Sequence, residues 1–371
     1  MNNKILTALI LVLITASCAA QTRDSLDLKI AQMLLIGFRG MSLPDNDPFL
    51  RDVREGRVGN VILFDFDVPT RAYKRNIESP QQVRTLTAQL SRAASQSGTG
   101  LPLFISIDQE GGKVNRLKEK YGFAPSVSQQ YLGKINNPDT THRYAAKTAQ
   151  TLADNGFNLN FAPSVDVNVN PENPVIGKIE RSFSAEPSIV AAQAEIIVEE
   201  HRKKGIVTTL KHFPGHGSSK ADSHKGFVDV SDSWKPDEIT PYATLIAAGK
   251  VDMIMTAHIF NNRLDADVPA TLSKRVITGI LRDSLKYQGV VISDDMQMGA
   301  IADHYGLDVA LEKCINAGVD ILCFGNNLQY DPDIITKATS IIRRLVKEGK
   351  IKEARIDESY KRIVALKRKI Q

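Results

Sequence analysis

Short apolar runs recur along the chain, and polar loops and amphipathic segments separate them. Such near-continuous apolar runs are typical of strands that are buried on both faces of a parallel sheet. The runs that we expect to form strands lie at residues 34–38, 61–66, 103–107, 159–165, 206–210, 253–256, 290–293 and 321–324.

Amphipathic segments with helical spacing lie between most of these runs, and a further one starts at Leu26, before the first run. The helices that we expect lie at residues 80–95, 140–155, 188–204, 236–248, 273–285, 307–317, 331–347 and 356–370. Eight such units predict an α/β fold, a (β/α)8 barrel of the TIM type. An open doubly wound sheet is the alternative. No feature marks a domain boundary, so we predict a single domain over residues 26–371.

The first residues have the form of an export signal. Lys4 supplies a positive charge, residues 5–14 are apolar, and small residues precede Cys18. The apolar run is too short to span a bilayer, so we predict that residues 1–17 are a signal peptide. Cys18 is placed like the lipidated cysteine of a bacterial lipoprotein of the periplasm or outer membrane, with residues 18–25 as a linker. Ordinary signal cleavage and soluble export is the alternative.

The composition allows a full core and argues against a nucleic-acid partner. The chain has 371 residues, 42% of them hydrophobic, and a net charge of only +5 with scattered basic residues. The last helix holds the one basic concentration, which is most simply a charged, solvated face. Its basic residues are Lys361, Arg362, Lys367, Arg368 and Lys369. We expect a monomer that contacts the membrane through its lipid anchor only.

Two cysteines remain if Cys18 is lipidated. Cys314 and Cys323 could pair in an oxidising compartment, or they could be two small buried thiols in a helix and the next strand. The sequence leaves both interpretations open.

Polar side chains gather where the predicted strands end, as a barrel with its active site at the carboxyl ends of its strands requires. They are Asp108 to Gly112 after the third strand, Asp166 after the fourth, Lys211 and His212 after the fifth, His258 after the sixth, and Asp294 and Asp295 after the seventh. The amino ends of the same strands carry no comparable clusters. This asymmetry favours both a barrel and a polar active site.

The densest cluster is the loop at residues 211–224, which holds three of the seven histidines in the chain. Asp222 and His224 are two residues apart, and a carboxylate bonded to one ring nitrogen makes an imidazole a general acid and base near neutral pH. Asp294 extends from a stiff strand, which makes it a candidate nucleophile or charge stabiliser. Asp295 could equally cap the following helix.

Two chemistries fit these residues. A metal-dependent hydrolase would use His212, His216 and His224 as ligands together with carboxylates. However, no His-x-His ends an early strand, and no clear arrangement of bridging carboxylates is visible. A glycosidase would use Asp294 as nucleophile and His224, in place of the usual second carboxylate, as acid/base. We favour the glycosidase, which requires no metal and no other cofactor.

Several motifs make the sequence similar to the β-N-acetylglucosaminidases of glycoside hydrolase family 3, from about Leu26 to the C-terminus. They lie at residues 108–116 (DQEGGKVNR), 181–183 (RSF), 211–224 (KHFPGHGSSKADSH), 293–296 (SDDM) and 355–359 (RIDES). The string at 211–224 is the most specific of them. Three residues, 178–180, precede Arg181 where the family commonly has one, so the loop is longer here.

The resemblance implies a role for each matching residue. Asp294 matches the nucleophile that forms a glycosyl-enzyme intermediate, His224 matches the acid/base, and Asp222 matches its supporting partner. The residues that match the groups holding the hydroxyls of the terminal sugar are Asp108, Arg116, Arg181, Lys211 and His212.

The function that the resemblance implies is that of a retaining exo-β-N-acetylglucosaminidase. Its carbohydrate substrates would be muropeptides, other peptidoglycan fragments or chitooligosaccharides. A phosphorylase of the same family is an alternative, because a histidine acid/base does not repel phosphate as a carboxylate does. The sequence also leaves open a β-glucosidase of this family and, from a different class, a sugar-binding lipoprotein without catalysis.

Overall fold

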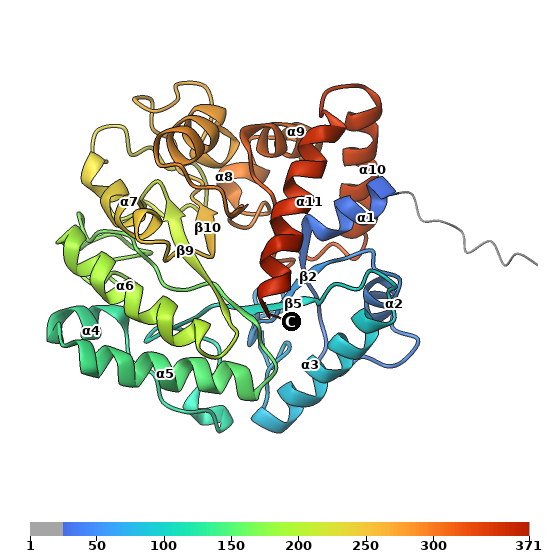
Figure 1. Cartoon of the computed structure of the whole chain (residues 1–371), viewed down its shortest axis with the longest axis horizontal. Helices are drawn as coiled ribbons and strands as arrows, with labels where there is room; N and C mark the ends of the chain where they lie inside the picture. The colour runs from blue at the N-terminus through green and yellow to red at the C-terminus, as the bar shows by residue number, and fades with distance from the viewer. Residues whose placement is uncertain (1–24, 371) are drawn as a thin grey trace, which may run out of the picture.

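The centre of the computed structural model, which describes residues 25–370, is a nearly closed sheet of eight parallel strands (Figure 1). The strands are β1 (Leu34–Gly37), β2 (Asn60–Ile62), β5 (Phe104–Ile107), β8 (Leu159–Asn160), β9 (Val207–Phe213), β10 (Met253–Thr256), β11 (Val290–Ile292) and β12 (Leu322–Phe324). Successive strands pair with each other, and β12 pairs with β1. A bridge from Ile292 to Ile321 brings β11 to the start of β12. The predicted barrel is therefore confirmed, and the open doubly wound sheet is wrong.

The strands are apolar because neither of their faces meets solvent. Every residue of these eight strands is buried, and their hydrophobic side chains belong to one contiguous core that extends to the surrounding helices. Burial of apolar surface on this scale is the main stabilising contribution, at roughly 25 cal/mol per Å². The barrel is therefore a rigid support for the groups at its ends.

Helices cover the outside of the barrel. The α-helices are α1 (Ser25–Gln32), α2 (Pro48–Arg54), α3 (Pro80–Ser95), α4 (Gln129–Ile135), α5 (Pro138–Asp154), α6 (Pro187–Arg202), α7 (Thr240–Ala247), α8 (Gly299–Ala302), α9 (Leu307–Ala317), α10 (Ile334–Lys347) and α11 (Glu353–Lys367). A π-helix, η4 (Arg275–Ser284), lies between β10 and β11 in the chain, and the 3₁₀ turns are η1 (Glu119–Tyr121), η2 (Pro236–Ile239), η3 (Ala270–Leu272) and η5 (Arg368–Ile370).

Local sequence explains where several helices begin. Ser79 precedes Pro80, and its hydroxyl accepts a hydrogen bond from the Gln82 amide at the start of α3. Asn137 and Pro138 start α5 in the same way. A capping side chain followed by proline satisfies the free amides of a first helical turn. The predicted helices at 80–95 and 307–317 match α3 and α9. The one at 236–248 is the 3₁₀ turn η2 followed by α7, the one at 273–285 is the π-helix η4, and the others differ at their ends by a few residues.

Three predicted strands are wrong in length. The run at 206–210 continues as β9 to Phe213, so Lys211 and His212 lie within the strand and do not follow it. The run at 61–66 forms a barrel strand only to Ile62, because the chain then leaves the barrel for an antiparallel hairpin of β3 (Phe66–Asp67) and β4 (Ala72–Tyr73). The run at 159–165 forms a strand only to Asn160, and beyond it Ser164 makes a single bridge to β9. A second short hairpin, β6 (Gln109–Gly111) and β7 (Val114–Asn115), follows β5.

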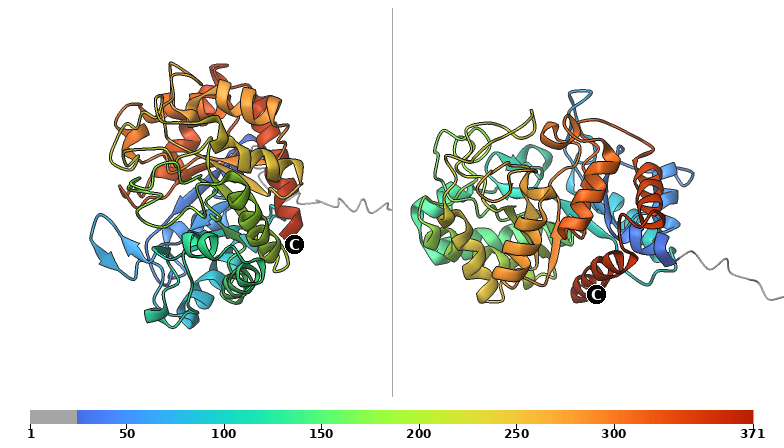
Figure 2. Two further views of the ribbon diagram at one scale, coloured as in Figure 1. Left: turned by 90° about the vertical axis from the view of Figure 1, so that its left-hand side faces the viewer. Right: turned by 90° about the horizontal axis from the view of Figure 1, so that it is seen from above.

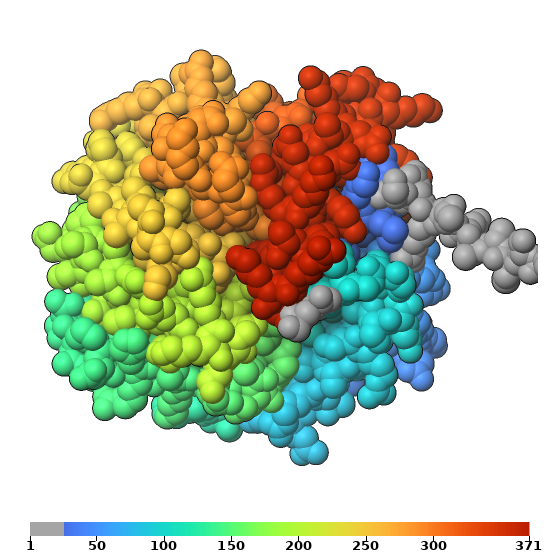
Figure 3. Space-filling model, viewed as in Figure 1, coloured from blue at the N-terminus to red at the C-terminus, as the bar shows by residue number. Residues whose placement is uncertain are grey.

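The amino-terminal end of the barrel is covered by α11, which crosses the view in Figures 1 and 3. Lys367 of α11 is fully buried there, and its ammonium donates to the Gly59 carbonyl (2.6 Å) and to Oε1 of Gln32 (2.7 Å). Burial lowers the pKa of Lys367 to about 7. The prediction of a solvated basic face is therefore wrong for this lysine. The right-hand view of Figure 2 shows the long loops at the opposite end of the barrel.

The predicted signal peptide and the lipidated Cys18 lie outside the described residues. Within residues 25–370, no helix is both long enough and apolar enough to cross a membrane. Cys314 on α9 and Cys323 on β12 are both buried, unpaired thiols. Of the two interpretations of these cysteines, the structure therefore shows the one without a disulfide.

Candidate active site

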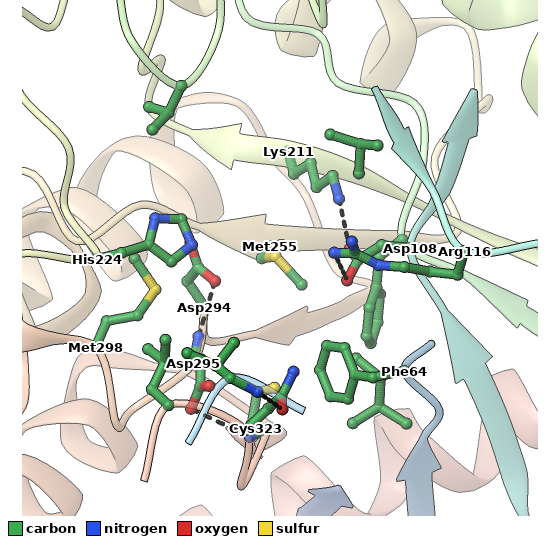
Figure 4. Close-up of a pocket in the computed structure, with 18 of the residues that line it drawn as sticks. Phe64, Asp108, Arg116, Lys211, His224, Met255, Asp294, Asp295, Met298 and Cys323 are labelled. Atoms are coloured by element: carbon green, nitrogen blue, oxygen red, sulfur yellow. Dashed lines mark hydrogen bonds and ion pairs between the residues drawn. The ribbon is translucent and has the colours of Figure 1, made fainter. Parts of the chain in front are cut away.

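A cavity of about 280 Å³ opens at the carboxyl ends of the strands, at the end of the barrel opposite α11. The predicted site residues that line it are Asp108, Arg116, Arg181, Lys211, His212, His224 and Asp294. Figure 4 shows His224 and Asp294 on one side of the cavity and Asp108, Arg116 and Lys211 on the other. Segments far apart in the sequence thus bring these groups together.

One wall of the cavity is a network of charged residues centred on Glu110, whose side chain is 1% exposed, whereas that of Arg116 is 28% exposed. Arg181 donates two hydrogen bonds to the Glu110 carboxylate, from Nε (2.9 Å) and Nη2 (2.7 Å). The Lys211 ammonium lies 2.6 Å from Glu110 and 2.8 Å from Asp108, and Arg116 Nη2 lies 3.7 Å from Asp108. Burial raises the pKa of both carboxyl groups, but the neighbouring cations outweigh it and hold both values below the ordinary range.

His212 is oriented by Asp166 in the same wall. Its Nδ1 lies 2.7 Å from Asp166 Oδ2, and its Nε2 lies 3.1 Å from Nη2 of Arg181. Since a guanidinium only donates, Nε2 is the acceptor and Nδ1–H donates to the carboxylate. The other oxygen of Asp166 accepts the backbone amides of His212 (3.2 Å) and His216 (2.7 Å). Asp166, which the sequence placed only at a strand end, therefore fixes both the ring and the loop.

Asp222 and His224 form the predicted pair. His224 Nδ1 lies 2.8 Å from Asp222 Oδ1, which also accepts the backbone amide of His224 (3.0 Å). Burial lowers the pKa of His224, but the hydrogen bond to Asp222 and the charge of Asp294 outweigh it, so the pKa is raised. The hydrogen bond from His224 in turn lowers the pKa of Asp222. Because Nδ1 is engaged, Nε2 is the nitrogen available for proton transfer to a substrate.

Asp294 lies among three imidazoles. Burial raises its pKa, but His258, His212 and His224 outweigh this and hold the pKa at about 2. Its Oδ1 accepts the backbone amide of Asp295 at 2.8 Å. His258 is itself fixed, because its two ring nitrogens bond the Thr271 hydroxyl (2.8 Å) and the Asp295 carbonyl (2.9 Å). Asp294 is therefore an ionised carboxylate that faces the cavity.

The Asp295 carboxylate binds backbone amides of the turn after β11 and of the end of β12. Its Oδ1 accepts the amides of Gln297 (3.0 Å) and Gly325 (3.1 Å), which joins the turn after β11 to the end of β12. Burial raises the pKa of Asp295 to about 6. The structure thus separates the two adjacent aspartates, with Asp295 bonded to the turn that leads into α8.

The loop that carries His224 is held from two sides. His216 Nε2 lies 3.1 Å from the Ser223 hydroxyl, and burial lowers the pKa of His216 to about 4, so its ring is neutral. The amides of Gly299 and Ala300 donate to the carbonyls of His224 and Ser223, each at 3.3 Å. The position of His224 therefore depends on contacts from the start of this loop and from α8 as well as on Asp222.

Two further acidic residues near the cavity were not among the predicted site residues. Asp65 lines the cavity and is bonded to Lys118. Glu238 is fully buried under the loop, where it accepts the amides of Ser218 and Lys235, each at 3.2 Å. Burial raises the pKa of Glu238 to about 7. A carboxylate within the apolar run at 61–66 was the available signal for Asp65, and no local pattern pointed to Glu238.

The three histidines of the metal-hydrolase alternative serve other bonds. His212, His216 and His224 are bonded to Asp166, Ser223 and Asp222, respectively. Among residues 25–370, no three His, Cys, Asp or Glu side chains converge in a way that could hold a metal ion. The described residues therefore give no support to a metal centre built from these histidines.

Comparison with known sequences gives concordant matches. The sequence model described as the glycosyl hydrolase family 3 N terminal domain matches residues 25–366. Beta-hexosaminidase A of Pseudoalteromonas piscicida is 35% identical over 333 residues, which cover 84% of this chain and 54% of that protein. Beta-hexosaminidase of Xylella fastidiosa (strain M23) is 33% identical over 317 residues, which cover 84% of this chain and 87% of that protein. The chain thus spans about half the length of the first relative and most of the second.

Solved structures give the same result. A glycoside hydrolase family 3 beta-N-acetylglucosaminidase from Paenibacillus sp. str. FPU-7 superposes with a TM-score of 0.83 at 35% identity, over 94% of this chain and 63% of that chain. Beta-N-acetylhexosaminidase from Beutenbergia cavernae DSM 12333 superposes with a TM-score of 0.80 at 26% identity, over 93% of this chain and 98% of that one.

Proposed function

This chain belongs to glycosyl hydrolase family 3, and we propose that it is a retaining exo-β-N-acetylglucosaminidase. The observation that carries the proposal is the placement of Asp294 and the Asp222–His224 pair at one cavity, opposite a wall of charged residues. The names of the relatives support the choice of the sugar. The substrate is a glycan fragment with a terminal β-linked N-acetylglucosamine.

This arrangement supports a reaction in two nucleophilic displacements at the anomeric carbon. In the first, an Asp294 oxygen attacks the anomeric carbon, the bond to the leaving oxygen breaks, and the His224 imidazolium gives its proton to that oxygen. In the second, neutral His224 takes a proton from water, the water oxygen attacks the same carbon, and Asp294 is released. The low pKa of Asp294 and the raised pKa of His224 supply the starting ionisation states near neutral pH.

The charged wall holds the terminal sugar in this scheme. Lys211, Arg116 and Arg181 are donors and Asp108 is an acceptor, which suits a ring with several hydroxyl groups. Hydrogen bonds from such preorganised groups can strengthen as charge develops at the transition state. The network around Glu110 fixes these groups before substrate binds, so little reorganisation is needed.

The first experiment compares p-nitrophenyl β-N-acetylglucosaminide with the matching β-glucoside, for wild type, Asp294→Ala and Asp295→Asn. We expect preference for the acetamido sugar, near-complete loss in Asp294→Ala, and measurable activity in Asp295→Asn. Azide should rescue Asp294→Ala and give the α-glycosyl azide, because azide then attacks from the side vacated by the carboxylate. Near-full turnover by Asp294→Ala would refute the proposal.

Product analysis separates hydrolysis from phosphorolysis. With phosphate present, a hydrolase releases free N-acetylglucosamine, initially as the β-anomer if the configuration is retained. Formation of N-acetylglucosamine 1-phosphate would identify a phosphorylase instead. Preference for the β-glucoside would identify a β-glucosidase, and turnover of neither aryl glycoside would favour a sugar-binding role.

We also propose that the protein is exported and anchored through Cys18. The support is the sequence pattern of residues 1–18, with its apolar run and small residues before the cysteine. Labelling with a palmitate analogue in a bacterial host should mark wild type and not Cys18→Ser. Labelling of both proteins, or of neither, contradicts the anchor.

A further inference from the structure

The β3–β4 hairpin stands on the catalytic rim beside the cavity. Asp65, Phe66 and Val68 line the cavity, and Phe66 pairs with Tyr73 across the hairpin. The left-hand view of Figure 2 shows this blue hairpin projecting from the body of the molecule. The hairpin therefore extends one wall of the cavity outward, beyond the charged residues that surround the terminal sugar in the proposed function.

Buried polar contacts hold the base of the hairpin in place. Asp67 accepts hydrogen bonds from Nε of Arg39 (2.7 Å) and Nη1 of Arg75 (2.8 Å). The Asn327 side chain donates to the Phe66 carbonyl (3.1 Å) and accepts the Val68 amide (3.2 Å). These contacts tie the hairpin to the loop after β12. Its outer surface is therefore presented in one orientation.

That outer surface carries an exposed aromatic ring. Tyr73 is 58% exposed, and its ring meets Phe66 edge-on with centroids 5.0 Å apart. The Lys120 ammonium lies 4.3 Å from the centroid of Tyr73 and 5.1 Å from that of Tyr121. Within the described residues, the buried hydroxyl of Tyr121 has no hydrogen-bond partner. Phe66 lines the cavity and Tyr73 contacts Phe66, so the exposed Tyr73 ring lies next to the cavity lining.

The cations around this ring differ in their pairing. Lys74 is paired with Glu78 (2.6 Å), and Lys118 is paired with Asp65. Over the described residues, Lys120 has no carboxylate partner within 4.0 Å, although Glu119 precedes it in the chain. Of the two lysines whose ammonium groups lie over the Tyr73 ring, Lys118 and Lys120, Lys120 is therefore the one that remains able to pair with an anion from a ligand.

We propose that Tyr73, Phe66 and Lys120 form a subsite for the leaving group, and that this subsite binds a sugar residue carrying a carboxylate. The proposal rests on the proposed function, because it places the second sugar next to the cavity that takes the terminal one. The apolar face of a sugar ring packs on the part of Tyr73 that Lys120 leaves exposed, and the carboxylate of that sugar pairs with Lys120. Among the substrates named above, this selects acidic cell-wall fragments over neutral chitooligosaccharides.

Three substrates with the same terminal sugar test the subsite. They are the methyl β-N-acetylglucosaminide, chitobiose, and the disaccharide of N-acetylglucosamine β-1,4-linked to N-acetylmuramic acid, whose second sugar adds a lactyl carboxylate. Tyr73→Ala should lower kcat/KM for both disaccharides by about fivefold, the size of one aromatic contact, and leave the methyl glycoside unchanged. Lys120→Ala should lower kcat/KM by about threefold for the acidic disaccharide alone, as loss of an exposed ion pair predicts.

Two control variants accompany these substitutions, one at another exposed tyrosine and one that keeps the ring of Tyr73. Tyr131 is 42% exposed, meets Tyr144 edge-on and does not line the cavity, so Tyr131→Ala should leave all three substrates unaffected. Tyr73→Phe keeps the ring and should behave as wild type. An equal effect of Tyr73→Ala on all three substrates, or of Lys120→Ala on both disaccharides, overturns the subsite. Wild type that hydrolyses none of them, including the methyl glycoside, would instead overturn the proposed function and the subsite with it.

Discussion

Replacement of Glu110 by alanine should destabilise the protein and disturb the charged wall of the cavity. The Glu110 side chain is 1% exposed and pairs with both Arg181 and Lys211. Its removal leaves two cations in a buried site, with Asp108 still next to Lys211. The groups that we expect to hold the terminal sugar would lose the carboxylate that positions them.

The size of the expected loss of stability follows from the ion pairs that Glu110 makes. Removal of one partner of a buried ion pair costs roughly 3–5 kcal/mol, because the remaining charge stays buried without compensation. Since Asp108 continues to neutralise Lys211, we expect Glu110→Ala to lower the free energy of unfolding by about 3 kcal/mol at neutral pH. Glu110→Gln keeps the volume and one acceptor oxygen, so its loss should be smaller, at about 2 kcal/mol. In both variants KM should rise more than kcat falls, because ground-state contacts to the sugar are lost as well.

The assay is urea-induced unfolding at pH 7, with kinetics on p-nitrophenyl β-N-acetylglucosaminide under the same conditions. Glu172→Ala is the matched control, because its carboxylate is 78% exposed and pairs with Lys178 on the surface. Such a pair is worth at most about 1 kcal/mol, so the control should be close to wild type. If Glu110→Ala costs no more than Glu172→Ala, the assignment of Glu110 as the centre of the wall is refuted.

Three further predictions concern titratable groups. Asp222→Asn replaces the carboxylate with a neutral amide, which removes a charge and weakens the hydrogen bond that raises the pKa of His224, so the basic limb of the pH profile of kcat/KM should move to lower pH. Glu238 has a pKa of about 7 when folded, against an ordinary 4.5, so wild type should lose up to about 3 kcal/mol of stability as pH rises through this interval. In urea unfolding at pH 5 and 8, the fall should be smaller in Glu238→Gln than in wild type by up to about 3 kcal/mol. Lys367 has a folded pKa of about 7 against 10.5, so the stability that wild type gains between pH 7 and 10 should be absent in Lys367→Met.

The barrel could be predicted because a local pattern marks each of its strands. A strand buried on both faces must be apolar at nearly every position, and polar residues then mark its end. The length of a strand could not be predicted from this pattern, because it depends on where the chain leaves the barrel. Residues 64–66 are apolar or aromatic around Asp65, yet they lead into the rim hairpin, which is tied to Asn327 from the other end of the chain.

The catalytic candidates could be predicted because, like the strands, they are marked by local sequence. The residues that hold them in place could not be predicted in this way. Asp294 and His224 follow strand ends or sit in a dense polar loop, where local sequence is informative. Glu110 is visible in the motif at 108–116, but its importance comes from two cations that arrive from other parts of the chain. Lys367 looks like a solvated helix residue until α11 is placed across the end of the barrel.

The adjacent pair Asp294 and Asp295 shows how the environment divides two identical side chains. Burial raises the pKa of both, and for Asp295 it prevails and gives a value of about 6. For Asp294, imidazoles from β9, from the following loop and from the end of β10 prevail and give a value of about 2. A nucleophile must be ionised at working pH, whereas a carboxyl group that accepts backbone amides can serve as a support. The lower pKa of Asp294, on which its proposed role as nucleophile rests, is therefore attributed to three histidines, of which His258 lies 36 residues before Asp294 in the chain.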